Sequence, residues 1–202
     1  MELILASNNE KKLKELRAIL TEMGHTVCSQ RAAGLDFVAE ETGETFLENA
    51  RIKAQAVVDA TGRAAIADDS GLVVEALGGA PGVYSAEYGG DQCKTDWDRL
   101  QYLLRNMEGE ENRRAWFVST IACLFPDGTS IEAEGRLEGE LLRAPKGEGG
   151  FGYDPIFYVS EAGLSFAEME PELKNSLSHR GRALRAFREM WERQHTQQIK
   201  EL

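Results

Sequence analysis

The chain has 202 residues, the length of one domain or of one unit with two lobes. Its 23 lysines and arginines against 34 aspartates and glutamates give a formal charge of −11. This balance argues against a general binder of nucleic acids or of anionic membranes, because both need a basic face. With 42% hydrophobic and 28% charged residues, the composition is that of a soluble globular protein. An anionic substrate would therefore need a local basic cluster or a metal ion.

The cysteines and the N-terminal segment predict a reduced, cytoplasmic protein. The three cysteines are widely spaced and form no CxxC pair, which argues against a zinc site or a redox dithiol. Residues 1–20 lack the basic start, long apolar stretch and small-residue cleavage site of a signal peptide. No apolar run is long enough for a membrane span, so we expect no membrane partner.

Hydrophobic periodicity and capping residues predict the elements of the first third of the chain. A short buried strand over residues 2–6 leads into a helix capped by Asn8 or Asn9 and ended at Gly24. A second strand covers residues 26–29, and residues 30–43 are irregular. A capping box formed by Thr45 and Glu48 opens a helix that we expect to end at Gly62.

Strands dominate the predicted middle of the chain. A strand over residues 64–67 runs into a turn at residues 68–71, and a second extended segment covers residues 72–75. The later predicted elements are a loop over 78–92, a helix over 94–106, paired strands over 116–125 and 129–142, a loop over 147–152, a strand over 156–159 and a helix over 178–194. This order predicts an α/β fold with a mixed sheet.

Two adjacent carboxylates follow the strand that begins at Ala64. Asp68 and Asp69 precede Ser70 and Gly71, and paired carboxylates at a strand end suit Mg²⁺, which prefers oxygen ligands. Adjacent strand residues point to opposite faces, so both reach one ion only if a turn begins between them. The alternative is that one aspartate caps the turn.

A second acidic group precedes the Thr45 helix. Its members are Glu40, Glu41, Glu44 and Glu48. By themselves such residues are more often a solvated cluster that favours a helix start. A functional role is indicated only for a glutamate of this group that faces Asp69.

Small polar residues and two lysines join the first strand to the first helix. The segment reads Ser7-Asn8-Asn9-Glu10-Lys11-Lys12. Backbone N–H groups at a helix start bind phosphate, and a lysine in the first turn can reach the outer phosphates. The glycines of a Walker A loop are absent. The alternative is an ordinary capped helix with its lysines in water.

Two segments late in the chain carry further polar groups. Gly147–Gly152 matches GxGxxG, but it precedes a strand and is therefore no Rossmann fingerprint. Its aromatic residue, Phe151, can offer a stacking surface, although an ordinary flexible loop has the same composition. The second segment runs from Lys174 to Gly181 and places His179 and Arg180 at a helix start, where both can donate to a carbonyl or phosphate oxygen.

Six ordered blocks together resemble the inosine/xanthosine triphosphate pyrophosphatase family, over residues 3–190. The blocks are Leu5–Asn9 with Lys12, Glu41–Gly43 with Thr45–Ala50 and Lys53, Ala67–Leu72, Leu77–Ala86, Gly149–Pro155 and Ser178–Gly181. Such an ordered set is far more specific than any single motif. The resemblance implies an elongated mixed sheet with two α/β lobes and a central substrate cleft, so that residues 1–202 form a single two-lobed domain.

The resemblance also implies an activity and a set of roles. It implies a homodimer and Mg²⁺-dependent cleavage of deaminated purine triphosphates (ITP, dITP, XTP) to the monophosphate and pyrophosphate. Glu41 and Asp69 would bind the metal, and Asp69 would be the catalytic base. The remaining matched positions are assigned to the substrate: Ser7, Asn8, Asn9, Glu10, Lys11, Lys12 and Lys53 to the phosphates, and Ser70, Phe151, Gly152, Tyr153, Asp154, Lys174, His179 and Arg180 to the nucleotide.

Two positions depart from the pattern of the family. Asn8 stands where a glycine is usual, and Glu87 stands where a basic residue is usual. Glu87 removes a possible phosphate contact, which keeps open the alternative of a nucleotide-binding sensor without turnover. A pyrophosphatase for other modified nucleotides is a second alternative. The negative charge of the chain disfavours polymeric nucleic acid as a partner.

Overall fold

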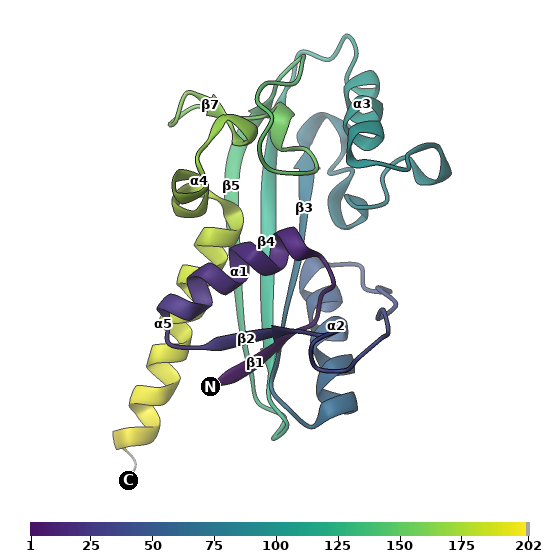
Figure 1. Ribbon diagram of the computed structural model, residues 1–202. Coiled ribbons are helices and arrows are strands. Elements are labelled where there is room, and N and C mark those ends of the chain that lie inside the picture. Colours follow the sequence, from purple (N-terminus) through teal and green to yellow (C-terminus); the bar gives the residue numbers. More distant parts are fainter. Residues whose placement is uncertain (201–202) are drawn as a thin grey trace. The chain divides into compact units, whose positions relative to one another are not determined.

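The computed structural model describes residues 1–200, with side chains described through residue 194. The elements combine one sheet with five α-helices (Figure 1). In chain order they are β1 Glu2–Leu5, α1 Glu10–Glu22, β2 Thr26–Ser29, α2 Phe46–Thr61, β3 Ala65–Val74, η1 Glu75–Leu77, η2 Gly82–Tyr84, η3 Gly90–Gln92, α3 Asp96–Asn106, β4 Arg114–Leu124, β5 Ser130–Leu141, η4 Asp154–Ile156, β6 Phe157–Val159, β7 Leu164–Ser165, η5 Phe166–Glu168, α4 Pro171–Leu177 and α5 His179–Lys200.

The sheet is mixed, as the sequence predicts. Its strand order is β2-β1-β3-β4-β5-β6-β7. β1 pairs in parallel with both β2 and β3, whereas β6 pairs antiparallel with β5 and with β7. The parallel pairs follow from the helices α1 and α2, which carry the chain back to the same sheet edge before each new strand.

The predicted turn at residues 68–71 is wrong. β3 continues without a break from Ala65 to Val74 and carries both aspartates inside the strand. Asp68 is 2% exposed and Asp69 is 6% exposed. Ser70 and Gly71 suggested a turn because both are small and polar or flexible, but pairing with the neighbouring strands outweighs this weak local preference.

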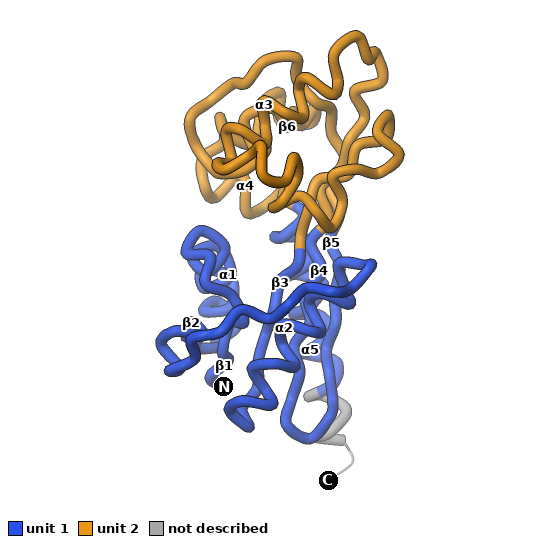
Figure 2. Tube along the Cα trace, turned by 90° about the vertical axis from the view of Figure 1, so that its right-hand side faces the viewer, with its two compact units in different colours: residues 1–69, 119–135, 179–202 blue, residues 70–118, 136–178 orange. Residues whose placement is uncertain are grey.

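The chain divides into two compact units (Figure 2). Unit 1 comprises residues 1–69, 119–135 and 179–202, and unit 2 comprises residues 70–118 and 136–178. Strands β3, β4 and β5 each contribute residues to both units. The division supports two structural units in this chain, and the substrate cleft expected between two lobes stays a prediction.

In unit 1, helices pack on both faces of the sheet. Leu16 of α1 and Phe187 of α5 pack in one cluster with Leu5 and Ile66, whereas Ala54 of α2 packs in another cluster with small strand residues. The second cluster holds Ile4, Ala6, Ala65, Ala67 and Ala122. Alternate residues of β1 and β3 therefore face α1 and α5 on one side and α2 on the other.

Unit 2 has a separate core that includes a group of packed phenylalanine side chains. Phe157 and Phe166 are fully buried, and Phe117 packs edge-on against Phe157 with ring centroids 4.7 Å apart. Leu100 and Leu103 of α3 join the same cluster. Each unit thus has its own hydrophobic core, which is what lets each fix its polar side chains locally.

The predicted helix ends are largely confirmed. Asn9 caps α1, and Gly62 ends α2 in the left-handed conformation. The sequence reading missed α4, which ends at Leu177, so Lys174 lies near the end of one helix rather than at the start of another. Ser178 follows in an extended conformation, and α5 begins at His179. Among the described residues, no helix is both long and apolar enough to cross a membrane.

Candidate functional site

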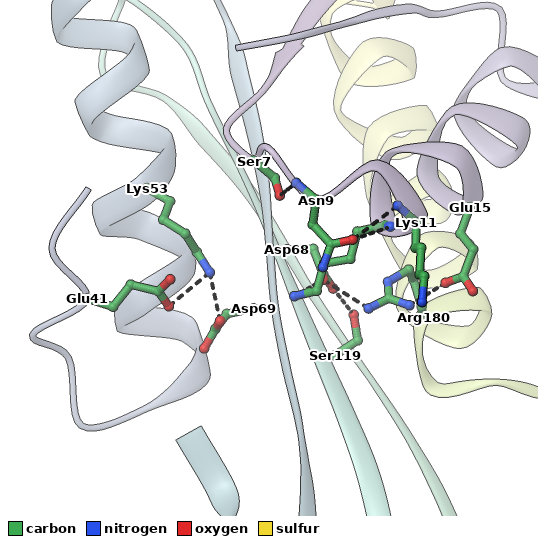
Figure 3. Close-up of polar contacts among 11 residues, drawn as sticks. Ser7, Asn9, Lys11, Glu15, Glu41, Lys53, Asp68, Asp69, Ser119 and Arg180 are labelled. Atoms are coloured by element: carbon green, nitrogen blue, oxygen red, sulfur yellow. Dashed lines mark hydrogen bonds and ion pairs between the residues drawn. The ribbon is translucent and has the colours of Figure 1, made fainter. Parts of the chain in front are cut away.

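Asp68 and Asp69 point to opposite faces of β3. Ala65 and Ala67 belong to the cluster under α2, whereas Ile66 belongs to the cluster under α1 and α5. Strand alternation therefore directs Asp69 toward α2 and Asp68 toward α1 and α5. The contacts agree, as Figure 3 shows: Asp69 meets a lysine of α2, and Asp68 meets Arg180 of α5. The two carboxylates thus belong to different constellations.

The first constellation is a lysine held between two carboxylates. Lys53 Nζ donates to Asp69 Oδ1 at 2.7 Å and to Glu41 Oε2 at 3.0 Å (Figure 3). Asp69 and Lys53 have side chains only 8% and 13% exposed, whereas that of Glu41 is 41% exposed. The sequence placed these three residues in separate blocks, and the fold of unit 1 brings them together.

The electrostatics of this group favour a carboxylate that can exchange a proton near neutral pH. Burial raises the pKa of Asp69 to about 6, although the charges of Lys53 and Lys12 oppose this increase. Burial opposes the charge of Lys53 as well, but Asp69 and Glu41 outweigh it and raise the pKa of Lys53. The second oxygen of Asp69, Oδ2, is buried and accepts no hydrogen bond from the described residues.

A fixed loop brings Glu41 to Lys53. The backbone N–H of Gly43 donates to Asn49 Oδ1 at 2.8 Å, and Asn49 is buried in α2. A Cβ on Gly43 would lie 2.6 Å from the Cβ of Glu48, so this approach requires glycine. Glu48 completes the predicted capping box with Thr45. Of the four glutamates in the acidic group, Glu48 is therefore a cap, Glu41 contacts Lys53, and Glu40 and Glu44 are exposed.

The segment expected to bind phosphate is a well-ordered helix cap. Ser7 Oγ accepts from the N–H of Asn9 at 3.1 Å, and Asn9 Oδ1 accepts from the N–H groups of Lys11 and Lys12 at 3.1 and 3.2 Å. The cap therefore occupies two of the backbone donors that the sequence offered to a phosphate group. Asn8 and Glu10 are exposed. Phosphate binding by this segment stays a prediction.

The second constellation surrounds Asp68 in the interior of unit 1. Lys12 Nζ lies 3.0 Å from Asp68 Oδ2, and Arg180 Nη2 donates to the same oxygen at 3.2 Å. Ser119 Oγ donates to Asp68 Oδ1, and Arg180 Nη1 donates to Glu15 (Figure 3). Burial opposes the ionised form of Asp68, but Arg180 and then Lys12 outweigh it and hold its pKa well below the usual range. Asp68 is therefore ionised at neutral pH.

His179 and Arg180 lie at the start of α5 in unit 1, and both are buried. The resemblance assigns both side chains to the nucleotide. Arg180 instead uses its two terminal nitrogens on Asp68 and Glu15, in the interior of the same unit. Direct contact of either residue with a base stays a prediction.

A third group of predicted site residues lies in unit 2. Lys174 Nζ donates to Asp154 Oδ2 at 2.8 Å, with side chains 8% and 5% exposed. The same ammonium lies 5.0 Å from the ring centroid of Phe151 and 5.5 Å from that of Phe166. The N–H of Phe151 also donates to Asp154 Oδ2 at 2.8 Å. One carboxylate thus fixes both the lysine and the aromatic residue.

The neighbouring positions of the glycine-rich block have structural contacts. The N–H of Gly152 donates to Asp96 Oδ2 at 3.1 Å, and the hydroxyl of Tyr153 donates to the carbonyl of Ser85 at 2.8 Å. Tyr153 is 5% exposed, and burial raises its pKa. Ser70 is half-buried in β3. These contacts hold the loop in place.

Glu41 and Asp69 suit a divalent cation, although they are only two ligands. Among the described residues, no group of three or more His, Cys, Asp or Glu side chains could hold a metal ion. Mg²⁺ commonly uses one or two carboxylates together with substrate phosphates, so a pair is sufficient. Both carboxylates already share one cation, the Lys53 ammonium, and Asp69 Oδ2 is a buried acceptor without a donor. The donor set therefore fits Mg²⁺.

The sequence reading missed three residues of these constellations. They are Glu15 and Ser119, which contact Arg180 and Asp68, and Phe166, which lies near Lys174. Helix periodicity places Glu15 on a polar position of α1, and no motif distinguishes it from other surface acids. The only available signal was strand alternation, which predicts that Asp68 and Asp69 need different partners.

The chain is an α/β protein with one mixed sheet, in which a lysine of α2 joins two carboxylates. The model of the Ham1 family matches residues 3–190, and the chain belongs to this family.

Relatives and solved structures cover nearly the whole chain. The chain is 52% identical to a dITP/XTP pyrophosphatase of Nostoc sp. over 92% of its length and 91% of that protein. It is also 52% identical to a dITP/XTP pyrophosphatase of Thermus thermophilus, over 95% of its length and 92% of that protein. The structure of a HAM1 protein from Coxiella burnetii superposes with a TM-score of 0.87 at 40% identity, covering 96% of this chain and 99% of that one.

Proposed function

We propose that this protein hydrolyses non-standard purine nucleoside triphosphates (ITP, dITP and XTP) to the monophosphate and pyrophosphate. Such an activity keeps deaminated purines out of DNA and RNA. The observation that carries the proposal is the buried pair of Asp69 and Lys53 with Glu41 as a second acid. It combines with about 50% identity to relatives named dITP/XTP pyrophosphatase.

Asp69 is the group that accepts the proton of the attacking water. Its pKa of about 6 leaves it ionised at neutral pH while keeping it basic enough to take up a proton. Lys53 donates to Oδ1 and so fixes the carboxylate, which leaves Oδ2 as the acceptor without a donor. Water held at that oxygen attacks the α-phosphorus, and pyrophosphate leaves.

We assign Mg²⁺ to Glu41 and Asp69. When bound, the ion offsets the charge of the phosphate oxygens and of the leaving pyrophosphate. Lys12 and the segment from Ser7 are assigned to the phosphates, where a lysine ammonium acts as a compact charge. The negative charge of the chain makes such local cations necessary.

The aromatic and basic residues of unit 2 are assigned to the nucleobase. Phe151 offers a ring for stacking, and the Lys174–Asp154 pair offers a donor beside it. A donor aimed at the six-position oxygen of hypoxanthine or xanthine stays unpaired when adenine presents an amino group there. Such a mismatch in a site built for hydrogen bonds can cost a factor of roughly 10⁴ in kcat/KM.

A triphosphate panel tests the proposal. ITP, dITP, XTP, ATP, GTP and dUTP are incubated with and without Mg²⁺, and pyrophosphate and orthophosphate are measured separately. We expect pyrophosphate from the deaminated purines and only with Mg²⁺. Orthophosphate as the product, or a preference for dUTP, supports a different nucleotide hydrolase. Tight binding of ITP without any product identifies a sensor.

Two variants accompany the panel. Asp69→Asn removes the proposed base, whereas Asp59→Asn makes the same chemical change at an exposed position of the same unit. We expect only the first to abolish turnover. Pyrophosphate release by Asp69→Asn at the wild-type rate would falsify the assignment of the base.

The homodimer and the cytoplasmic location that the resemblance implies are part of the same proposal. Exposed aromatic residues of unit 2, Tyr84 at 65% and Trp97 at 57%, support a surface that a second copy covers. Light scattering coupled to size exclusion measures the mass, and a monomer at micromolar concentration contradicts the homodimer.

A further inference from the structure

Asp68 is enclosed by three donors from three different elements. Lys12 comes from α1, Ser119 from β4 and Arg180 from α5. Both cations meet the same oxygen, Oδ2, and the hydroxyl meets the other. Asp68 is 2% exposed. It is therefore shielded from any ligand and can influence a reaction only through its partners.

The cluster combines acidic and basic side chains inside unit 1. Asp68 and Glu15 are the acids, and Lys12 and Arg180 are the bases. Removing several charges from water is costly, and well-packed apolar residues often give equal or higher stability in place of a buried ion pair. Stability by itself is therefore a weak reason for four ionic side chains at this place.

Such a cluster fixes the positions of its charged groups. A lysine has a flexible four-carbon stem, and its ammonium is a point charge with three donors. The contact with Asp68 selects one location for the Lys12 ammonium, whose side chain is 18% exposed, while leaving it further donors. Arg180 is held by two carboxylates and is 3% exposed, so its guanidinium is fixed as well.

We propose that Asp68 is a positioning residue that fixes Lys12 and Arg180 together, so that one buried carboxylate sets the geometry of the lysine assigned to the phosphates and of Arg180, which the family resemblance assigns to the nucleotide. This inference rests on the proposed function. It also assigns Asp68 a role apart from the metal, because its oxygens face α1 and α5, while Asp69 faces Lys53 on the other side of β3.

Asp68→Asn should change two measurable properties, the overall kcat/KM and the preference for ITP over ATP. In Asp68→Asn the side chain keeps its size and an oxygen for Ser119, but it loses the charge that attracts both cations. We expect kcat/KM to fall by roughly ten- to hundredfold for every accepted triphosphate, because Lys12 loses its fixed partner. We also expect the preference for ITP over ATP to fall at least tenfold, because Arg180 loses the Asp68 carboxylate that fixes it beside Glu15.

A second variant isolates the part that depends on Arg180. Glu15→Gln weakens the other contact of Arg180 and leaves the Lys12–Asp68 pair in place. We expect it to lower the preference for ITP over ATP with little change in KM for ITP. If Glu15→Gln and Asp68→Asn shift KM for ITP equally, Asp68 has no separate effect on Lys12, and the inference is overturned.

A double-mutant cycle tests whether Asp68 acts through Lys12. Lys12→Met and Asp68→Asn are combined, and kcat/KM for ITP is measured for all four proteins. If Asp68 positions Lys12, the double variant is no worse than the poorer single variant. Independent roles predict that the two losses multiply, which contradicts the inference.

A measurement without turnover keeps the test independent of the proposed function. The Lys12 ammonium protons give an NMR signal when a fixed partner slows their exchange with water, and the Lys12→Met protein assigns that signal. We expect the signal in the wild type and its loss in Asp68→Asn. Its persistence in Asp68→Asn overturns the inference even if no triphosphate is cleaved, and absence of pyrophosphate from the wild type alone overturns the proposed function.

Ser119→Ala provides the test if Asp68→Asn does not fold. It removes only the hydroxyl that donates to Asp68 Oδ1 and leaves all four charges in place. We expect a two- to tenfold loss of kcat/KM with a weakened Lys12 signal. Unchanged kinetics together with an unchanged signal contradict the inference.

Discussion

Replacing Lys53 by methionine should change the protonation of Asp69. In the native protein burial raises the pKa of Asp69 to about 6, and the Lys53 ammonium at 2.7 Å limits that increase. Methionine fills a similar volume without the charge. The variant would leave Asp69 buried, with the like charge of Glu41 nearby. The ionised form of Asp69 would then lose the cation that stabilises it most, the Lys53 ammonium.

The magnitude follows from the burial of the pair. The side chains of Lys53 and Asp69 are 13% and 8% exposed, so solvent screens their attraction only weakly. Breaking such a buried ion pair by removing one partner costs about 3–5 kcal/mol. At about 1.36 kcal/mol per pKa unit, this corresponds to a rise of roughly 2–4 units. The pKa of Asp69 in Lys53→Met should therefore lie at roughly 8 or above.

The assay is a carboxyl ¹³C NMR titration of the protein without metal ions, in which Asp69→Asn assigns the signal. Lys53→Arg is the matched control, because it retains a cation, and its titration should stay close to that of the wild type. With Mg²⁺ and ITP, Lys53→Met should be nearly inactive at pH 7, since the carboxylate is then protonated and cannot accept a proton. A midpoint that remains near 6 in Lys53→Met would refute the reasoning.

The remaining predictions concern the base, unit 2 and the packing of α5. In the wild type, turnover with Mg²⁺ should decline at acidic pH, because protonation of Asp69 removes the acceptor; a pH–rate profile measures this. Asp154→Asn should lower the free energy of unfolding by about 3–5 kcal/mol, measured by urea titration, because Lys174 then lies buried without its carboxylate. Gly135→Ala should shift the start of α5 and lower the unfolding temperature, since its Cβ would lie 2.1 Å from the carbonyl oxygen of His179.

Each of these predictions has a contrary result. A pH–rate profile that stays flat at acidic pH contradicts the role of Asp69. If Asp154→Asn is as stable as Glu172→Gln, an exposed substitution in α4, the Lys174–Asp154 pair is not an important contact. Gly128→Ala, a change with open space around the Cβ but a left-handed backbone, separates backbone strain from the steric conflict at Gly135.

The sequence by itself determined most local structure of this protein. The capping box at Thr45 and Glu48 and the left-handed Gly62 fixed both ends of α2, because the residues that satisfy helix ends lie within one turn of them. The family resemblance assigned Glu41 and Asp69 to the metal and Lys53 to the phosphates, and the structure brings all three within hydrogen-bond distance. Local chemistry was sufficient for the helix ends alone.

Only the tertiary structure decided how the two adjacent aspartates differ. The local sequence favoured a turn at residues 68–71, whereas pairing in the sheet keeps β3 straight through Val74. A continuous strand sends Asp68 and Asp69 to opposite faces, so helices distant in the sequence supply their partners. Glu15, Ser119 and Arg180 meet around Asp68 because α1, β4 and α5 pack together, and no short-range pattern encodes that meeting.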